Sequence, residues 1–164
     1  MCQQADDLIR IHGRTYSVIG RPLDGADSPT IKHRLGELRS YRSSLYRGYR
    51  CTWEIRAGRL WLADWYGMTA DGDVGLGWLF PGAPGPVHAT WFTGELVTGR
   101  GKADQVGMYL RGWPYYRTYD VQAGEVLGST LKDDRAAFRA GAARHRRMWE
   151  TLDALDAAEK KLRT

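Results

Sequence analysis

The segment from Tyr46 to Tyr66, YRGYRCTWEIRAGRLWLADWY, decides the fold, because it joins two apolar and aromatic runs by a short turn. Between Cys51 and Ile55 every second residue is apolar, which is the spacing of a β-strand with one buried face. The pair Ala57-Gly58 follows, and glycine adopts positive φ without a steric penalty, so a tight hairpin turn is predicted there. The return run, residues 60–65, is apolar on both faces, which predicts a central strand covered on both sides.

The rest of the chain repeats this pattern of short strands and turns. One hairpin is predicted from Leu8 to Ile19, and another from Tyr115 to Leu127. The alternating runs from Val87 to Val97 and from Val106 to Leu110 each predict a further strand. Residues 21–44, rich in Pro, Gly, Ser and Arg, predict a long connection with one helical turn. Short strands at this spacing indicate an antiparallel meander that curls into a barrel or into two packed sheets.

The composition changes after the last predicted strand. From Asp133 onward Ala, Arg, Lys, Glu and Leu dominate, and apolar side chains recur every three or four residues. We expect one long amphipathic helix, capped by Asp133 or Asp134 and weakened at Gly141 by about 1 kcal/mol relative to Ala. The predicted fold class is therefore α+β. A mostly antiparallel β domain covers residues 1–131, and a helical extension over residues 132–164 packs on the sheet or binds a partner.

Size and cysteine content limit the class of protein. The 164 residues make about one domain, and no run approaches the ~20 apolar residues that a membrane span requires. The first ten residues lack the basic and apolar regions of a secretory signal, so we expect a cytoplasmic protein that does not bind membranes. Cys2 and Cys51 have neither disulfide nor metal-ligand spacing and are predicted to be free thiols.

Five motifs in a fixed order resemble those of a family of uncharacterised bacterial proteins. They are TYSVIGRPLDG (15–25), RGYRCTWEIRAGRLWL (47–62), LFPG (79–82), WFTGEL (91–96) and YYRTYDVQAGEV (115–126). The likeness covers residues 15–130 and leaves the helical extension outside it. The resemblance implies a bacterial accessory protein, and it brings no established activity with it.

Carboxylates on the predicted strands are the first candidates for chemistry. Glu54, Asp64 and Glu95 lie in strand runs, and two of them brought close together would form an acid and base pair. Outward-facing strand carboxylates that pair with arginines are the commoner arrangement, so no catalytic residue is assigned. His88 is the one histidine within a predicted strand, and no His or Cys spacing fits zinc. The sequence therefore predicts neither a metal site nor a cofactor.

Basic residues interleaved with tyrosines suggest nucleic acid. The net charge of +5 and the pI near 9.4 permit such binding without establishing it. Arg and Tyr interleave in residues 34–50, RLGELRSYRSSLYRGYR, and Arg144 to Arg147 form a basic patch on the predicted helix. Arg contacts phosphates and Tyr stacks on bases. The 19 Asp and Glu residues make the surface mixed, which favours an ordinary solvated face.

The sequence supports three functional hypotheses. The leading one is a non-enzymatic binding or interaction module that recognises another protein, or a second copy of itself, by its aromatic strand surface and its helix. The second is single-stranded nucleic-acid or RNA binding through residues 34–50. The third is a small-molecule site inside the barrel, lined by Trp61, Trp65, Trp91 and Tyr109, with Glu54 or Glu95 as its polar group. The candidate binding residues are Arg50, Glu54, Trp61, Asp64, Trp65, Trp91, Glu95 and Tyr109 on the β domain, with Arg144, Arg147, Met148, Trp149 and Leu152 on the helix.

Overall fold

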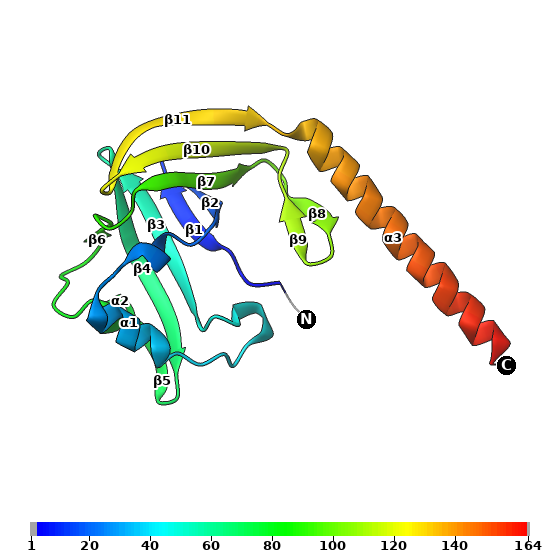
Figure 1. The fold of residues 1–164 in the computed structure, drawn as a ribbon, viewed down its shortest axis with the longest axis horizontal. Helices are drawn as coiled ribbons and strands as arrows, with labels where there is room; N and C mark the ends of the chain where they lie inside the picture. Colours follow the sequence, from blue (N-terminus) through cyan, green and yellow to red (C-terminus); the bar gives the residue numbers. More distant parts are fainter. Residues whose placement is uncertain (1–2, 164) are drawn as a thin grey trace.

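Seven strands close into a barrel in the computed structural model, which describes residues 3–163 (Figure 1). They are β1 (Asp7–Ile11), β2 (Arg14–Ile19), β3 (Tyr49–Arg56), β4 (Arg59–Thr69), β7 (Gly94–Arg100), β10 (Tyr115–Gln122) and β11 (Glu125–Asp133). Around the barrel they follow the order β4-β3-β1-β2-β7-β10-β11 and return to β4. Neighbours run antiparallel except β1 and β3, which are parallel. The predicted α+β class and the barrel-like sheet are confirmed.

The remaining elements surround this barrel. β5 (Gly72–Gly75) and β6 (Val87–His88) pair with β4, while β8 (Asp104–Gly107) and β9 (Leu110–Gly112) form a separate hairpin. The connections hold two 3₁₀ turns, η1 (Pro22–Gly25) and η2 (Ser43–Leu45), and two short helices, α1 (Pro29–Gly36) and α2 (Leu76–Leu79). The C-terminal helix is α3 (Arg135–Leu162). Within residues 3–163 no helix has both the length and the apolar composition needed to cross a membrane.

The barrel hairpins turn through one shared backbone geometry. The two central residues are His12-Gly13 between β1 and β2, Ala57-Gly58 between β3 and β4, and Ala123-Gly124 between β10 and β11. All six have φ between +46° and +78°, as a type I′ turn requires, and that turn matches the twist of antiparallel strands. The hairpins predicted at these three places are confirmed.

Two connections differ from the sequence prediction. Residues 21–44 hold η1, α1 and the start of η2 rather than one helical turn. This connection leads from the end of β2 past β1 to the start of β3, which lies on the far side of β1 and parallel to it. The single strand predicted over Val106 to Leu110 is two strands, because Tyr109 adopts φ +58° and the chain reverses there.

The strand predicted from Val87 to Val97 is also wrong in part. Residues 89–93 leave the sheet between β6 and β7. The indole N–H of Trp91 donates to the carbonyl oxygen of Pro22 at 2.9 Å, and its ring packs against the core. Packing of this large, partly buried side chain therefore bends a segment whose alternation is typical of a strand.

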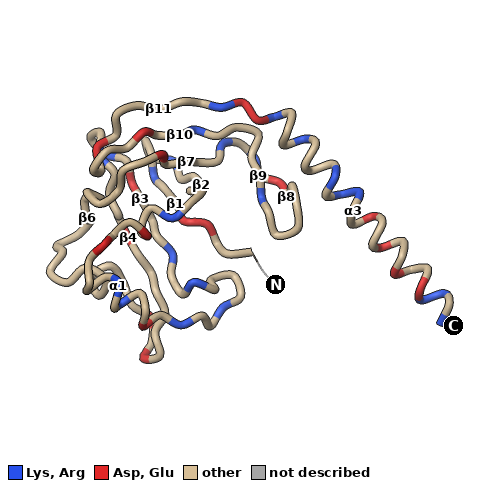
Figure 2. Tube along the Cα trace, viewed as in Figure 1, with Lys and Arg blue, Asp and Glu red and all other residues tan. Residues whose placement is uncertain are grey.

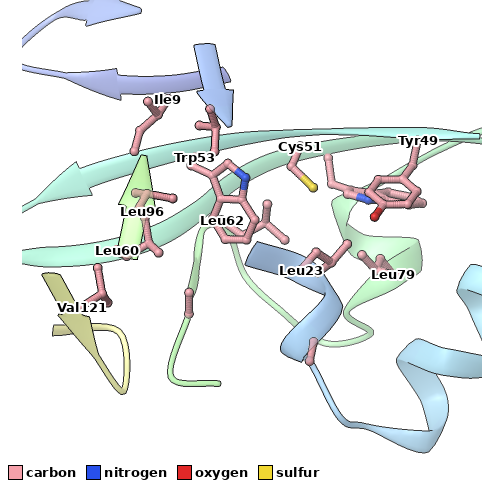
Figure 3. Close-up of a cluster of buried hydrophobic side chains, with 14 of the residues drawn as sticks. Ile9, Leu23, Tyr49, Cys51, Trp53, Leu60, Leu62, Leu79, Leu96 and Val121 are labelled. Carbon is pink, nitrogen blue, oxygen red and sulfur yellow. The ribbon is translucent and has the colours of Figure 1, made fainter. Parts of the chain in front are cut away.

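Side chains from the barrel strands fill its interior. Trp53 on β3 and Leu60 and Leu62 on β4 have no exposed surface. Figure 3 shows the side chains of Ile9, Trp53, Leu60, Leu62, Leu96 and Val121 gathered in this core, with Leu23 from η1 and Leu79 from α2 beside them. The interior is therefore a packed core that fixes the positions of the surface elements.

Helix α3 touches the rest of the protein near its first turns and then projects away from it (Figure 1). Asp134 stands at its N-cap position without a side-chain capping hydrogen bond, while Oδ1 of Asp133, the other residue predicted as a cap, accepts from the backbone N–H of Arg135 at 3.1 Å. Gly141 and Ala142 are the buried residues of the described helix. A Cβ atom added at Gly141 would lie 2.9 Å from Cβ of Val106, so glycine permits the close contact with β8.

Candidate functional site

The strand carboxylates predicted as candidates do not share one site. Glu54 on β3 lies 3.8 Å from the guanidinium of Arg10. Asp64 on β4 accepts a hydrogen bond from the backbone N–H of Trp65 at 2.8 Å. Glu95 is exposed on β7, and β1 and β2 separate that strand from β3. Each carboxylate therefore has its own surroundings.

The four aromatic residues predicted to line one pocket lie in different places. Trp65 is buried, and Trp91 is packed against the core. Trp61 faces out of β4, with its ring centroid 5.2 Å from that of His88. Tyr109 lies at the tip of the β8–β9 hairpin and is 55% exposed. These side chains consequently do not surround a common space.

Arginines of residues 34–50 make contacts within the molecule. Arg34 stacks on an indole ring, Arg47 forms a buried ion pair, and the Nε–H of Arg50 donates to a backbone carbonyl at 2.9 Å. These contacts hold the connection against the barrel. Nucleic-acid binding through this segment stays a prediction.

A series of stacked rings ties that connection to the barrel wall. The Trp65 ring stacks on Tyr49 at 6.0 Å between centroids and on Trp78 at 5.9 Å. The guanidinium of Arg34 lies over Trp78 at 5.4 Å, and that of Arg47 lies over Tyr49 at 4.5 Å. Cation–π and ring contacts of this kind fix the orientation of both arginines.

Asp7 is a buried carboxylate at the end of this stack. It pairs with Arg47 and accepts hydrogen bonds from the backbone N–H of Cys51 at 3.0 Å and from the indole N–H of Trp53 at 3.4 Å. Burial raises the pKa of the Cys51 thiol well above its usual value near 9.0, and the negative charge of Asp7 raises it further. Burial likewise raises the pKa of Tyr49. The ion pair is thus enclosed by groups that stay neutral.

Beside this ion pair lies a cleft of about 580 Å³. Its lining comes from residues 3–7, 18–21, 43–47 and 109–113, which are distant in the sequence. Figure 1 shows the N-terminal segment running between the β8–β9 hairpin and the loop around η2. The closed barrel brings these four segments together, and the cleft is the candidate functional site.

Apolar side chains dominate the rim of the cleft. Ile19, Tyr46, Tyr109 and Leu110 all line it, and each is between 39% and 57% exposed. The left-handed backbone at Tyr109 turns the hairpin there, and a residue other than glycine pays strain in that conformation. The hairpin thus presents apolar groups to solvent at a fixed position.

The polar groups of the cleft are mostly paired. Arg111 donates from Nη2 to the Asp6 carboxylate at 2.6 Å, and Asp7 pairs with Arg47. The Nε atom of Arg111 is buried and has no hydrogen-bond partner among residues 3–163. Arg21 adds a further guanidinium to the lining. The polar groups left for a ligand are therefore the guanidinium of Arg21 and the side chains of Gln3 and Ser43, which both donate and accept.

Backbone contacts fix the N-terminal wall of the cleft. The amide oxygen of Gln4 accepts from the backbone N–H of Arg47 at 3.2 Å, and Ala5 N–H donates to the carbonyl oxygen of Ser44 at 2.7 Å. A second hollow of about 460 Å³ shares this segment, and Arg50 contributes to its lining.

Sequence reasoning found only part of this site. Tyr109 lies in the cleft and Arg50 in the neighbouring hollow, and Tyr46 belongs to the segment 34–50 considered for nucleic acid, whereas Asp6 and Arg111 were not predicted. The available signal was the run MYLRG after Gly107, where three large side chains follow a glycine in a short hairpin. Of the helix residues, Arg144 lines a third hollow between α3 and the β8–β9 hairpin, while Met148, Trp149 and Leu152 lie on the projecting part.

Comparison of this chain with protein-family models, with curated proteins and with solved structures finds no match. Its function is therefore argued from the geometry of the cleft and of α3.

Proposed function

We propose that this protein is a non-enzymatic binding module that holds a segment of a partner protein in the cleft beside residues 3–7. One observation carries the proposal. Outside α3, half of the large apolar side chains that are exposed in residues 3–163 line this cleft, namely Ile19, Tyr46, Tyr109 and Leu110. Exposed apolar side chains that gather around a hollow are typical of recognition sites.

The free guanidinium in the lining favours a ligand that carries hydrogen-bond acceptors. Both carboxylates of the cleft already pair with arginines, and the exposed guanidinium of Arg21 remains to donate. An extended peptide presents carbonyl oxygens along its length and apolar side chains beside them. The volume of about 580 Å³ suits one or two such side chains with their backbone.

The cleft is also preformed, which supports binding. Its N-terminal wall is held by backbone hydrogen bonds at Gln4 and Ala5, and its floor by the ion pair between Asp7 and Arg47. A rigid site loses little conformational entropy when a ligand enters it.

The test is selection of binding peptides from a displayed random library on the full chain. Peptides that are enriched are synthesised, and their affinities are measured for the natural chain and for Tyr46→Asp. We expect the substitution to weaken binding about tenfold or more, equivalent to about 1.4 kcal/mol, because it places a charge against the apolar part of the ligand.

Tyr41→Asp is the matched control. Tyr41 lies in the same connection as Tyr46, is 64% exposed, and is not part of the cleft lining. It should leave the affinity unchanged. A library that yields no binding peptide, or peptides that bind Tyr46→Asp as tightly as the natural chain, would overturn the proposal.

A further inference from the structure

The second half of α3 carries an apolar stripe that the described chain leaves open. After His145, whose Nε2 accepts a hydrogen bond from the indole N–H of Trp149 at 2.8 Å, Met148, Leu152 and Leu155 follow at spacings of three and four residues, which is the seam of a coiled coil. Leu152 is 42% exposed and Leu155 63% exposed, and Trp149 beside them is 47% exposed. An amphipathic helix of this kind gains its stability by burying such a stripe.

Charge is divided between the two halves of the same helix (Figure 2). Residues 135–147 contain five arginines and no Asp or Glu. Residues 150–159 contain four carboxylates and no Lys or Arg, and Lys160 and Lys161 follow in the last turn. Residues 150–159 therefore attract a basic surface such as residues 135–147.

We infer that α3 pairs with α3 of a second copy of this chain in an antiparallel, two-fold symmetric dimer. In a parallel pair the arginines of both copies would face each other, and so would the carboxylates. An antiparallel pair sets the basic half of each copy against the acidic half of the other. Two-fold symmetry then forms both favourable contacts at once. This inference concerns a surface separate from the peptide cleft and does not depend on it.

The part of the stripe that the β8–β9 hairpin leaves uncovered determines how the two helices align. Its first positions, Phe138 and Gly141, face the β8–β9 hairpin, so pairing starts at His145. A symmetry axis beside residue 150 puts His145 opposite Leu155 of the second copy. In the next layer Met148 lies opposite Leu152 of that copy.

The same register brings opposite charges to the same level along the pair. At the level of Arg144 the second copy carries Asp156, and at the level of Arg147, on the outer face of the helix, it carries Asp153. Asp156 contacts Lys160 of its own helix at 2.9 Å, but this pair is exposed and such pairs contribute little, so the carboxylate is available. Opposite charges beside an apolar seam select partner and orientation.

Sedimentation velocity of the full chain tests association. We expect a species with twice the mass of 18.5 kDa that dissociates on dilution. Leu155→Asp should weaken association at least about tenfold by placing a charge in the seam. Leu127→Asp is the control, because Leu127 is 68% exposed on β11, away from the helix, and this variant should dimerise as the natural chain does. Circular dichroism shows whether both variants remain folded.

Disulfide trapping tests the orientation. Two chains, one with His145→Cys and one with Leu155→Cys, are made with Cys2 replaced by Ser, given different mass tags, mixed and oxidised. The antiparallel register predicts mixed disulfides between the two chains. Identical positions lie ten residues apart along the axis, about 15 Å, which is too far for a disulfide between like chains.

Three results would overturn the inference. They are a natural chain that stays monomeric at its highest soluble concentration, dimerisation that Leu155→Asp leaves unchanged, and disulfides that join like chains, which indicate parallel pairing.

Discussion

Asp7 shows how much of the fold depends on one side chain. Its carboxylate is buried and is the counter-charge of Arg47, whose side chain is 10% exposed. Asp7→Ala leaves that guanidinium buried without a partner, so we expect unfolding in urea at neutral pH to show a loss of about 3–5 kcal/mol.

Glu54→Ala provides the comparison for that loss. Glu54 lies on the neighbouring strand and contacts Arg10 at 3.8 Å in a partly exposed pair. The Glu54→Ala substitution should change the free energy of unfolding by less than about 1 kcal/mol. Equal losses in the free energy of unfolding for Asp7→Ala and Glu54→Ala would show that the buried ion pair with Arg47 stabilises the fold no more than the exposed pair does.

The thiol of Cys51 gives the protein a stability that depends on pH. Burial raises its pKa in the folded chain above the usual value near 9.0, so the folded state holds the proton more tightly than the unfolded state. The resulting stability is complete below pH 9 and is lost as the pH rises through the higher folded pKa. In a Cys2→Ser chain, the free energy of unfolding should fall more steeply above about pH 9 than in the same chain with Cys51→Ala. Parallel pH profiles for the two chains would contradict this expectation.

The elements that the sequence predicted well are those whose local signals agree. Each barrel hairpin has a two-residue turn ending in glycine between alternating strands, and glycine accommodates the positive φ found there. The segment from 89 to 93 has the same alternation without such a turn, and it leaves the sheet because Trp91 bonds to Pro22 in a distant connection. Contacts of this range are not visible in a local pattern.

The attachment of α3 depends on Gly141. Gly141→Val places side-chain atoms where a Cβ already lies 2.9 Å from Val106, so the helix should move off the β8–β9 hairpin. We expect faster amide hydrogen exchange in residues 104–107 with unchanged helix content. Ala140→Val introduces the same β-branched side chain at an exposed position and should leave exchange in that strand as it was. Equal exchange in both variants would contradict the role of this contact.

The barrel as a whole is expected to fold without α3. Within the described helix only Gly141 and Ala142 are buried, whereas the barrel core is formed by its own strands and by η1 and α2. A chain that ends at Asp134 retains all of β11. Thermal unfolding of this shortened chain, measured by near-ultraviolet circular dichroism, should be cooperative. Its midpoint should lie within a few degrees of that of the full chain. Loss of the near-ultraviolet signal at room temperature would show that α3 belongs to the core.

The cleft was harder to predict than the barrel, because it exists only after closure. Residues 3–7, 18–21, 43–47 and 109–113 carry no shared motif, and the parallel placement of β3 beside β1 brings them together. The stripe on α3 was visible in the sequence, since a helix repeats its faces at a constant spacing. The structure adds that the second half of this stripe stands clear of the barrel.

The projecting helix also controls how the molecule moves through water. Its 28 residues extend about 42 Å at 1.5 Å per residue, and most of that length lies outside the compact barrel. Friction depends on shape as well as mass, so a single chain should elute from a size-exclusion column ahead of a compact protein of 18.5 kDa. Removal of α3 should therefore reduce the drag by more than the lost mass alone accounts for.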